Sequence, residues 1–414
     1  MRSLQINNKL QFETKGVTPK YVEKSNTIVL NQKCVRHGFL DYSFARHISD
    51  EQKIPLEKYV KVGDILLNST GTGTAGRCAL VEYIPEGYKV TIDSHMLVLR
   101  FNNIDISSFF NYSLYRQENL ILDLLTGSSG QGELDRESVY NISFPFVENN
   151  LTYFNFLYSI ISKKIELNNK INSELEILAR TLYDYWFVQF DFPDELGRPY
   201  KSAGGSMEYN PILKREIPKG WAVENLAANN LTKILKPGIK QFDNEKTYLA
   251  TACIGNDQIT DYTNKITFDN REGRANMQPI ANSIWFAKMK NTKKVLYFGD
   301  YSAERMNELI ISTGMLGLQV PSYGLEYVWN FINNDSFEIL KNKLSHGATQ
   351  EGVNNDDLQF MPIIIPTKEI LAQFCELVKS VYQQKYENEQ EAKHLAELRD
   401  FLLPMLMNGQ VLIS

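Results

Sequence analysis

The feature that most constrains the fold of this 414-residue chain is an internal repeat. With a shift of 219 positions, four apolar residues of the first half (Ile65, Met96, Leu97, Leu99) match Ile284, Met315, Leu316 and Leu318, and Gln131 matches Gln350. After one inserted residue the shift is 220, and Phe154, Leu157, Leu175, Leu178 and Leu182 match Phe374, Leu377, Leu395, Leu398 and Leu402. Landmarks that keep their order and spacing this far predict two copies of one structural unit.

Each copy begins with a part that is rich in predicted strands. Short apolar runs with β-branched and aromatic residues, bounded by turn residues, occur at 64–68, 78–81 and 95–99, and again at 283–286 and 295–298. Such runs are typical of buried strands. We therefore expect an α+β chain with two β-rich α/β domains, at residues 1–150 and 221–366.

Each copy ends in a predicted long helix, at 151–190 and 367–404. Apolar residues recur there at spacings of three and four, which is the coiled-coil pattern, and Pro193 and Pro404 are expected to close the two helices. The expected seam residues are Phe154, Leu157, Ile161, Asn168, Leu175, Leu178, Leu182, Phe374, Leu377, Val381, Asn388, Leu395, Leu398 and Leu402. Two unrelated amphipathic helices, each packed on its own domain, would show the same spacing, so that alternative stays open.

A duplicated domain and helix suggest a pseudo-two-fold arrangement with the helices antiparallel. If Phe154 faces Leu402, then Asn168 faces its own repeat equivalent, Asn388. A polar pair inside an apolar seam would fix the register, whereas a place on the solvated flank would have no such effect, and the pattern does not choose between them. A helix over 154–182 would span about 43 Å and hold the domains apart like a ruler. The glycine- and proline-rich segment 191–220 is expected to be a linker.

Composition restricts the class of protein. The net charge is −5 and neither half is basic overall, so any DNA binding would depend on local patches or on a partner. The four cysteines are far apart, which suggests neither disulfides nor a metal site. We see no signal peptide or membrane span, and expect a cytoplasmic protein without membrane contact.

One motif imitates a nucleotide site. Gly71-Thr-Gly73-Thr-Ala-Gly76 satisfies the dinucleotide-binding pattern, but the following residues 77–84 read as a strand, where that pattern requires a helix. A glycine-rich turn between strands is the better interpretation. The P-loop, zinc-protease, amino-methyltransferase and nuclease patterns are absent, so we expect no catalytic residue and no metal. The four lysines in residues 288–294 could bind phosphate or form a solvated hairpin tip.

The chain resembles the DNA-specificity subunit of type I restriction-modification systems. Residues 63–77 resemble the signature of one class of target-recognition domain, and 282–290 that of another. Residues 178–187 resemble the end of the family's central helix, and 199–205 and 217–221 its linker. Together these segments cover essentially the whole chain in the family's order.

The resemblance implies that each domain reads one half of a split, asymmetric site in double-stranded DNA, while the helices set the gap and dock two modification subunits. Those subunits would bind S-adenosylmethionine and methylate adenine after base flipping. Restriction subunits would add cleavage driven by ATP with Mg²⁺. This chain itself would hold no cofactor.

No motif identifies the residues that contact bases, so these are chosen for side-chain chemistry and place. In the first domain we expect DNA contacts from Asn68, Ser69, Thr70, Thr72, Arg77, Ser128, Ser129 and Gln131. In the second we expect them from Lys288, Lys290, Asn291, Lys293, Thr349 and Gln350. Glutamine suits adenine and arginine suits guanine. A nucleotide-binding enzyme that uses the 71–76 loop, and a scaffold that binds no DNA, remain the competing hypotheses.

Overall fold

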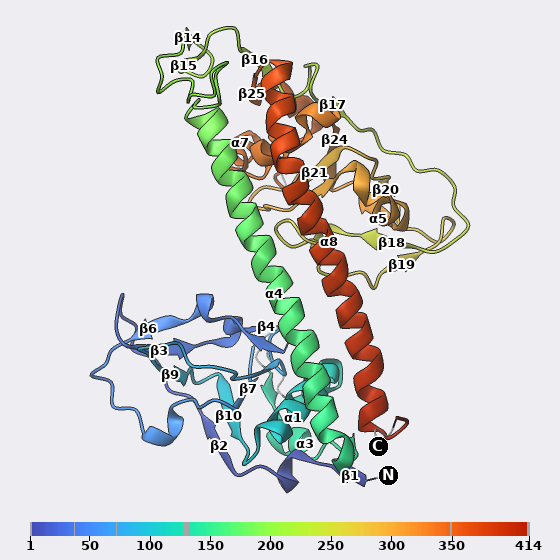
Figure 1. The fold of residues 1–414 in the computed structure, drawn as a ribbon. Coiled ribbons are helices and arrows are strands. Elements are labelled where there is room, and N and C mark those ends of the chain that lie inside the picture. Colours follow the sequence, from blue (N-terminus) through green and yellow to red (C-terminus); the bar gives the residue numbers. More distant parts are fainter. Residues whose placement is uncertain (1, 37, 72, 127–131, 348–349, 412–414) are drawn as a thin grey trace. The chain divides into compact units, whose positions relative to one another are not determined.

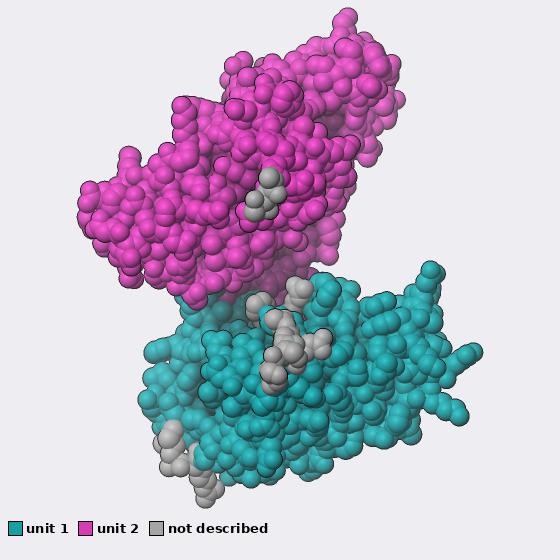
Figure 2. Space-filling view, turned by 180° about the vertical axis from the view of Figure 1, so that it is seen from behind, with its two compact units in different colours: residues 1–165, 393–414 teal, residues 166–392 magenta. Residues whose placement is uncertain are grey.

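The computed structural model describes residues 2–36, 38–71, 73–126, 132–347 and 350–411. The chain divides into two compact units, which are residues 1–165 with 393–414 (unit 1) and residues 166–392 (unit 2) (Figure 2). Both units mix helices and strands, which confirms the predicted α+β class. The units cut across the predicted segments, because each long helix contributes residues to both.

Unit 1 is built on a four-stranded sheet and a three-stranded sheet (Figure 1). Its strands are β1 (Arg2–Leu4), β2 (Phe12–Lys15), β3 (Thr27–Leu30), β4 (Val35–Arg36), β5 (Phe39–Leu40), β6 (Arg46–Ile48), β7 (Ile65–Asn68), β8 (Cys78–Leu80), β9 (Lys89–Ile92), β10 (Met96–Arg100), β11 (Leu125–Thr126), β12 (Glu133–Leu134) and β13 (Phe144–Phe146). Its helices, besides the long ones, are α1 (Ile104–Arg116), α2 (Glu118–Leu122) and α3 (Arg136–Tyr140).

The central strands of unit 1 are apolar throughout because both faces of their sheet are buried. Ile65 and Leu67 share a core cluster with Phe109 and Phe110 of α1 on one face. Leu66, between them, packs with residues of β3 and β9 on the other face. Each large apolar side chain buried in this way contributes about 1.5–3 kcal/mol.

Unit 2 repeats this plan. Its strands are β14 (Met207–Asn210), β15 (Arg215–Pro218), β16 (Ala222–Asn225), β17 (Lys233–Ile234), β18 (Lys246–Leu249), β19 (Lys265–Ile266), β20 (Ala275–Met277), β21 (Ser283–Ala287), β22 (Val295–Phe298), β23 (Leu309–Ser312), β24 (Met315–Gln319) and β25 (Pro362–Ile365). Its shorter helices are α5 (Ala303–Glu308), α6 (Leu325–Ile332) and α7 (Asp335–Leu344).

The two units match strand by strand. The order β2-β10-β7-β8 in unit 1 corresponds to β17-β24-β21-β22 in unit 2. Leu99 pairs with Ile65, and their repeat equivalents Leu318 and Ile284 pair in the same register. The parallel pair β3 and β9 corresponds to the parallel pair β18 and β23. The internal repeat predicted from sequence is therefore confirmed, and unit 2 adds one strand, β20, to its second sheet.

The long helices are α4 (Leu151–Tyr183), followed by a π-helical turn at 184–188, and α8 (Lys368–Met407). The predicted closure at Pro404 is wrong, because α8 contains this proline and runs three residues further. Leu403 and Leu406 on either side of it are buried in the core of unit 1, and this packing offsets the hydrogen bond that proline cannot donate.

The predicted linker is wrong in one respect, since residues 191–220 are packed and not a bare connector. Strands β14 and β15 form a hairpin there. Phe192, Ile217 and Trp221 are buried in the largest core cluster of unit 2. The rings of Phe192 and Trp221 stack with their centroids 4.9 Å apart. The glycines and prolines of this segment therefore shape turns of an ordered element.

Candidate nucleic-acid interface

The glycine-rich loop at 69–77 joins β7 to β8 in unit 1. Gly71, Gly73 and Gly76 all have positive φ angles, of 106°, 76° and 83°. A side chain at Gly76 would come within 2.9 Å of the Ile121 side chain. The Gly76 amide donates to the Asn68 carbonyl at 2.9 Å. Glycine is needed here for backbone geometry, and the loop leads into a strand, as the sequence predicted.

Three residues expected to contact DNA from this loop have other roles in the structure. Asn68 and Ser69 are fully buried. The Asn68 side-chain amide donates to the backbone carbonyls of Gln32 and Thr74, and the Ser69 hydroxyl donates to the His95 carbonyl at 2.9 Å. Arg77 forms an ion pair with Glu118 at 3.2 Å. A base contact by Asn68 or Ser69 would require the loop to open. In the closed loop both side chains stabilise its conformation through these hydrogen bonds.

Thr70 stands at the surface of this loop with two residues that sequence analysis missed. Its hydroxyl lies 2.8 Å from Nδ1 of the exposed His95, and the Gln32 amide donates to the Thr70 carbonyl. Gln32 and His95 belong to turns far away in the sequence, after β3 and before β10, so no local motif could connect them to the loop. An amide, an imidazole and a hydroxyl together offer both donors and acceptors to base edges.

A second segment of unit 1 is paired with the glycine-rich loop. Thr70 forms a β-bridge with Glu133, and the Leu134 amide donates to the Ser69 carbonyl at 2.8 Å. This places β12 beside the loop. Four of the expected contacts, Thr72, Ser128, Ser129 and Gln131, lie outside the described residues, and their roles stay predictions.

Unit 2 has the lysine-rich turn at the equivalent place. Residues 288–294 join β21 to β22, as the glycine-rich loop joins β7 to β8. Met289 forms a β-bridge with Gly352, and both are shifted by 219 from the bridged pair Thr70 and Glu133. The turn is thus paired with the segment that carries the exposed Gln350. Thr349 lies outside the described residues.

Two of the four lysines of this turn are paired with carboxylates, and the other two are partly withdrawn from solvent or bound to a carbonyl. Lys290 forms an ion pair with Glu351 at 2.8 Å, and Lys293 with Asp335 at 2.6 Å. Lys294 donates to the Thr251 carbonyl at 2.7 Å. Burial lowers the pKa of Lys288. A phosphate contact by Lys290 or Lys293 would have to displace a carboxylate, and their role in DNA binding stays a prediction.

The turn is also held from within by a buried cation. Lys341 of α7 donates to the carbonyls of Ala287 and Thr292 and pairs with Glu338 at 2.8 Å. The exposed Asn291 adopts a positive φ of 56°, and its amide donates to the Asn342 side chain. The turn therefore presents a defined backbone shape rather than a flexible tip.

Within each unit α4 and α8 pack antiparallel in the predicted register. In unit 2 the Asn168 amide lies 3.4 Å from the Asn388 carbonyl, and in unit 1 the Asn150 amide donates to the Leu406 carbonyl at 2.8 Å. In both pairs the facing numbers sum to 556, as expected. Asn168 is 1% exposed and Asn388 7%, so the asparagines lie inside the seam and not on its flank.

The expected leucine seam is wrong in part. Leu178, Leu377 and Leu398 are 49%, 50% and 46% exposed. Their neighbours Ala179 and Arg399 are buried instead. An apolar stripe read from sequence locates the contact face only to within about one residue, which is 100° of helix rotation. The other expected seam residues are buried or half-buried.

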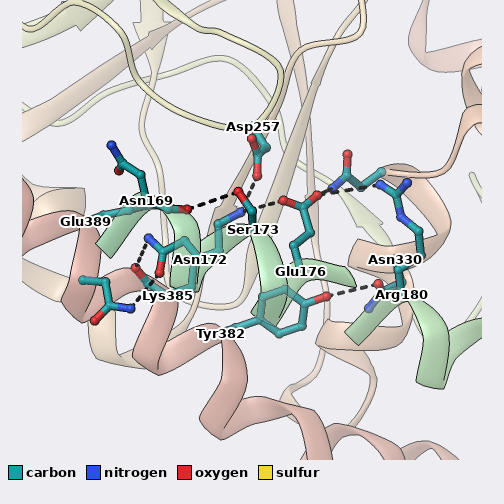
Figure 3. A network of polar contacts seen from close by, with 12 residues as sticks. Asn169, Asn172, Ser173, Glu176, Arg180, Asp257, Asn330, Tyr382, Lys385 and Glu389 are labelled. Carbon is teal, nitrogen blue, oxygen red and sulfur yellow. Dashed lines mark hydrogen bonds and ion pairs between the residues drawn. The ribbon is translucent and has the colours of Figure 1, made fainter. Parts of the chain in front are cut away.

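The middle of the seam in unit 2 is a polar network (Figure 3). Lys385 of α8 pairs with Glu176 of α4 at 3.3 Å and with Asp257 of the globular part. Asn388 donates to Asn172 at 2.8 Å, and Asn172 donates to the Lys385 carbonyl at 3.2 Å. Burial opposes the charge of Lys385, but the carboxylates of Asp257 and Glu176 outweigh it and its pKa is raised. The network joins both helices to the globular part of unit 2.

Two properties of the described residues bear on the class of protein. They contain no cluster of three or more His, Cys, Asp or Glu placed to hold a metal ion. Over the same part of the chain, no helix is long and apolar enough to cross a membrane.

Comparison with known proteins supplies the family. A family model described as the type I restriction modification DNA specificity domain matches residues 7–177. The HindI specificity subunit of Haemophilus influenzae is 23% identical over 419 residues, which cover 88% of this chain and 90% of the relative. The MjaIX specificity subunit of Methanocaldococcus jannaschii is 24% identical over 400 residues, which cover 89% and 84%. We therefore assign residues 7–177 to the type I DNA specificity domain, and over most of its length the chain is similar to the specificity subunits of type I restriction enzymes.

The fold agrees with that assignment. A crystal structure of the type I restriction-modification S subunit from M. genitalium aligns with a TM-score of 0.53 at 12% identity, covering 98% of this chain and 95% of the other. The two relatives named above are both specificity subunits of restriction enzymes. The family model covers the first globular part and most of α4. The matching strand order of unit 2 makes the second globular part a second copy of the same architecture.

Proposed function

We propose that this specificity subunit recognises a bipartite and asymmetric DNA site, with one half read by each unit. The observation that carries the proposal is the pair of equivalent loops. Both units use the same strands in the same register, yet the loop after β7 is rich in glycine and the loop after β21 is rich in lysine. Two copies of one scaffold that differ at one surface are suited to two different sequences.

The partners follow from the same duplication. Two equivalent helix-containing units offer two equivalent docking surfaces, so we propose two modification subunits for each specificity subunit. These would bind S-adenosylmethionine and methylate adenine in each half of the site, with restriction subunits that cleave unmodified DNA with ATP and Mg²⁺. The chain itself would hold none of these cofactors. Helices α4 and α8 would set the gap between the half-sites.

Sequencing of methylated adenines in host DNA, with and without this gene, tests the proposal. We expect one split motif with two different halves to lose methylation when the gene is deleted. Restoring the gene should restore the motif. A methylation pattern that does not change while the modification subunit is still expressed contradicts the proposal.

Single substitutions then assign each half-site to a unit. Gln32→Ala and Thr70→Ala should relax discrimination in one half, and Gln350→Ala in the other. A bidentate glutamine contact is worth about 1–3 kcal/mol, and the single hydroxyl of Thr70 should contribute less. Gln11→Ala, an exposed glutamine of unit 1 outside the loop, is the control and should leave the motif intact. If each variant relaxed both halves equally, the assignment of one unit to one half would be wrong.

The spacing role of the helices has a separate test. Removal of whole turns from both α4 and α8 should shorten the gap between half-sites and leave their sequences unchanged, since each turn accounts for about 5.4 Å. Methylation of a library with variable gaps measures this directly. A change in the half-site sequences at a constant gap would exclude the spacing role.

A further inference from the structure

Three lysines of unit 2 that make no ion pair among the described residues lie outside the lysine-rich turn, at a groove. A groove of about 760 Å³ is lined by the segment that follows β17, by residues that precede β21 and by α5. Its lining includes Lys236, Lys240 and Lys246, with the amide side chains of Gln241, Gln278 and Asn307. In Figure 1 the chain between β17 and β18 is a long irregular segment.

The lysines of the groove have no acidic partner in the described part of the chain. Lys236 and Lys240 are exposed and make no ion pair there. Lys246 is half-buried, and its ammonium lies 5.0 Å from the centre of the Phe242 ring. No carboxylate lines the groove, although Asp243 and Glu245 belong to the same segment. Burial without a counter-charge lowers the pKa of Lys246, because burial disfavours the charged form.

The backbone holds this segment in place. The Leu235 amide donates to the Gly317 carbonyl of β24 at 2.8 Å. The Gly238 amide donates to the Asn276 carbonyl at 2.8 Å, and Gly238 forms a β-bridge with Met277 of β20. The extra strand of unit 2 thus anchors the segment that carries the lysines. On the opposite wall Gln278 donates to the Met306 carbonyl at 3.1 Å.

The basic surface continues beyond the groove. A second hollow of about 650 Å³ shares Ala281 with it and is lined by Lys233, Asn229 and Asn282, again without a carboxylate. Lys233 makes no ion pair in the described part of the chain. The equivalent segment of unit 1, between β2 and β3, carries Lys20 and Lys24, which also lack an ion pair among the described residues. The same segment of the repeat therefore carries unpaired cations in both units.

We propose that Lys236, Lys240 and Lys246 form a phosphate-binding groove that holds the sugar–phosphate backbone of duplex DNA against unit 2. This inference rests on the proposed function and adds that different residues supply affinity and sequence recognition. Lysines without counter-ions supply the sequence-independent attraction, and the loops 69–77 and 288–294 with their paired segments supply sequence. Apolar residues between the lysines, such as Ile239 and Ile280, suit deoxyribose edges.

The test uses the complex with its modification subunit and two DNA duplexes, one with the recognised site and one scrambled. The triple variant Lys236→Gln, Lys240→Gln, Lys246→Gln is compared with wild type over a series of salt concentrations. The slope of log K against log salt is negative, and each lost phosphate contact reduces its magnitude by about 0.9, so the magnitude should fall by about 2–3. Both duplexes should bind more weakly by the same factor, which leaves their affinity ratio unchanged.

A matched variant controls for net charge. Lys201→Gln, Lys214→Gln and Lys219→Gln remove three exposed lysines of the β14–β15 region, and this variant should keep the wild-type slope. The triple change Lys236→Arg, Lys240→Arg, Lys246→Arg should also keep it, because arginine preserves the charge. An unchanged slope in the glutamine triple variant, with specific wild-type binding, overturns the inference.

Two other outcomes separate the possible failures. If the glutamine triple variant weakens assembly with the modification subunit and leaves the DNA slope unchanged, the groove binds an acidic protein surface and the inference is wrong. If the wild-type complex itself does not distinguish the two duplexes, the proposed function fails, whatever the slopes show.

Discussion

Unit 1 and unit 2 share their strand order and pairing register, but they differ in the side chains that lie between α4 and α8. Where unit 1 packs α4 against α8 through Phe154, Tyr158, Leu403 and Leu406, unit 2 places Lys385 among carboxylates and asparagines. The repeat equivalent of Lys385 is Ile165. The comparison teaches that a duplicated scaffold keeps the backbone pairing of its central sheet, while its helix seam and its loops diverge.

The largest expected effect comes from Lys385. Lys385→Met leaves Asp257 without its cation in a largely buried site, while Glu176 keeps only its longer pair with Arg180 at 3.7 Å. The free energy of unfolding of unit 2 should therefore fall, by up to about 3–5 kcal/mol. Urea unfolding of the full chain measures it. Lys379→Met is the matched control on the same helix, because its pair with Asp300 is exposed and should contribute under about 1 kcal/mol. Equal losses in both variants would show that the network adds nothing specific.

The glycine-rich loop should respond next. Gly76→Ala forces a side chain onto a positive φ and against Ile121, at a cost of about 1–3 kcal/mol to unit 1. Gly73→Ala has the same φ problem with open space around it, so it should cost less. The variants should be compared by thermal melting and by methylation of each half-site. A Gly76→Ala protein that alters only the half-site of unit 2 would break the assignment of loops to halves.

The hydrogen bond between Asn388 and Asn172 tests the polar contact inside the seam of unit 2. Asn388→Leu alone leaves Asn172 without its donor in a buried seam and should destabilise unit 2 by about 1–3 kcal/mol. Adding Asn172→Leu removes the unpaired group and should recover most of that loss, so the two changes should not be additive. A double-mutant cycle in urea measures the coupling, and strict additivity would contradict the contact between these side chains.

The smallest effect is a pH dependence of unit 2 that comes from one buried carboxyl. Burial raises the pKa of Glu326, whose repeat equivalent in unit 1 is the neutral Ser107. A carboxyl with a raised pKa in the folded state binds its proton more tightly than when unfolded. Its stabilisation is therefore complete below the unfolded pKa, and is lost as pH rises through the folded pKa.

Glu326→Gln keeps the acceptor for Tyr297 and removes the charge. The stability of the glutamine variant should therefore decline less than that of wild type as pH rises from the usual glutamate range toward neutral. Melting temperatures over that interval measure the difference. Parallel curves for the two proteins would show that this carboxyl does not titrate in the interval.

Much of the architecture was predictable from local patterns. The repeat, the strands at 65–68, 78–80 and 96–100, and the helix register all depend on the periodic placement of apolar residues, and burial of those residues drives the fold. The strand that follows the glycine-rich loop was predictable too, because the residues after Gly76 have strand and not helix character. The exposure of Leu178 was not predictable, since it depends on which side of the helix the neighbouring elements cover.

By itself, the sequence determined that this chain is a duplicated α+β protein with two long antiparallel helices, and that its two recognition surfaces differ. Only the tertiary structure decided which charges are available. Lysines 290 and 293 stand in the most basic stretch of the sequence, yet Glu351 and Asp335 neutralise them from distant segments. Lys236 and Lys240 belong to no motif or basic cluster that the sequence analysis identified, yet they line a groove without a carboxylate. The reason is physical, because the field at a lysine depends on what the fold brings within a few ångströms of it, and those neighbours are rarely neighbours in sequence.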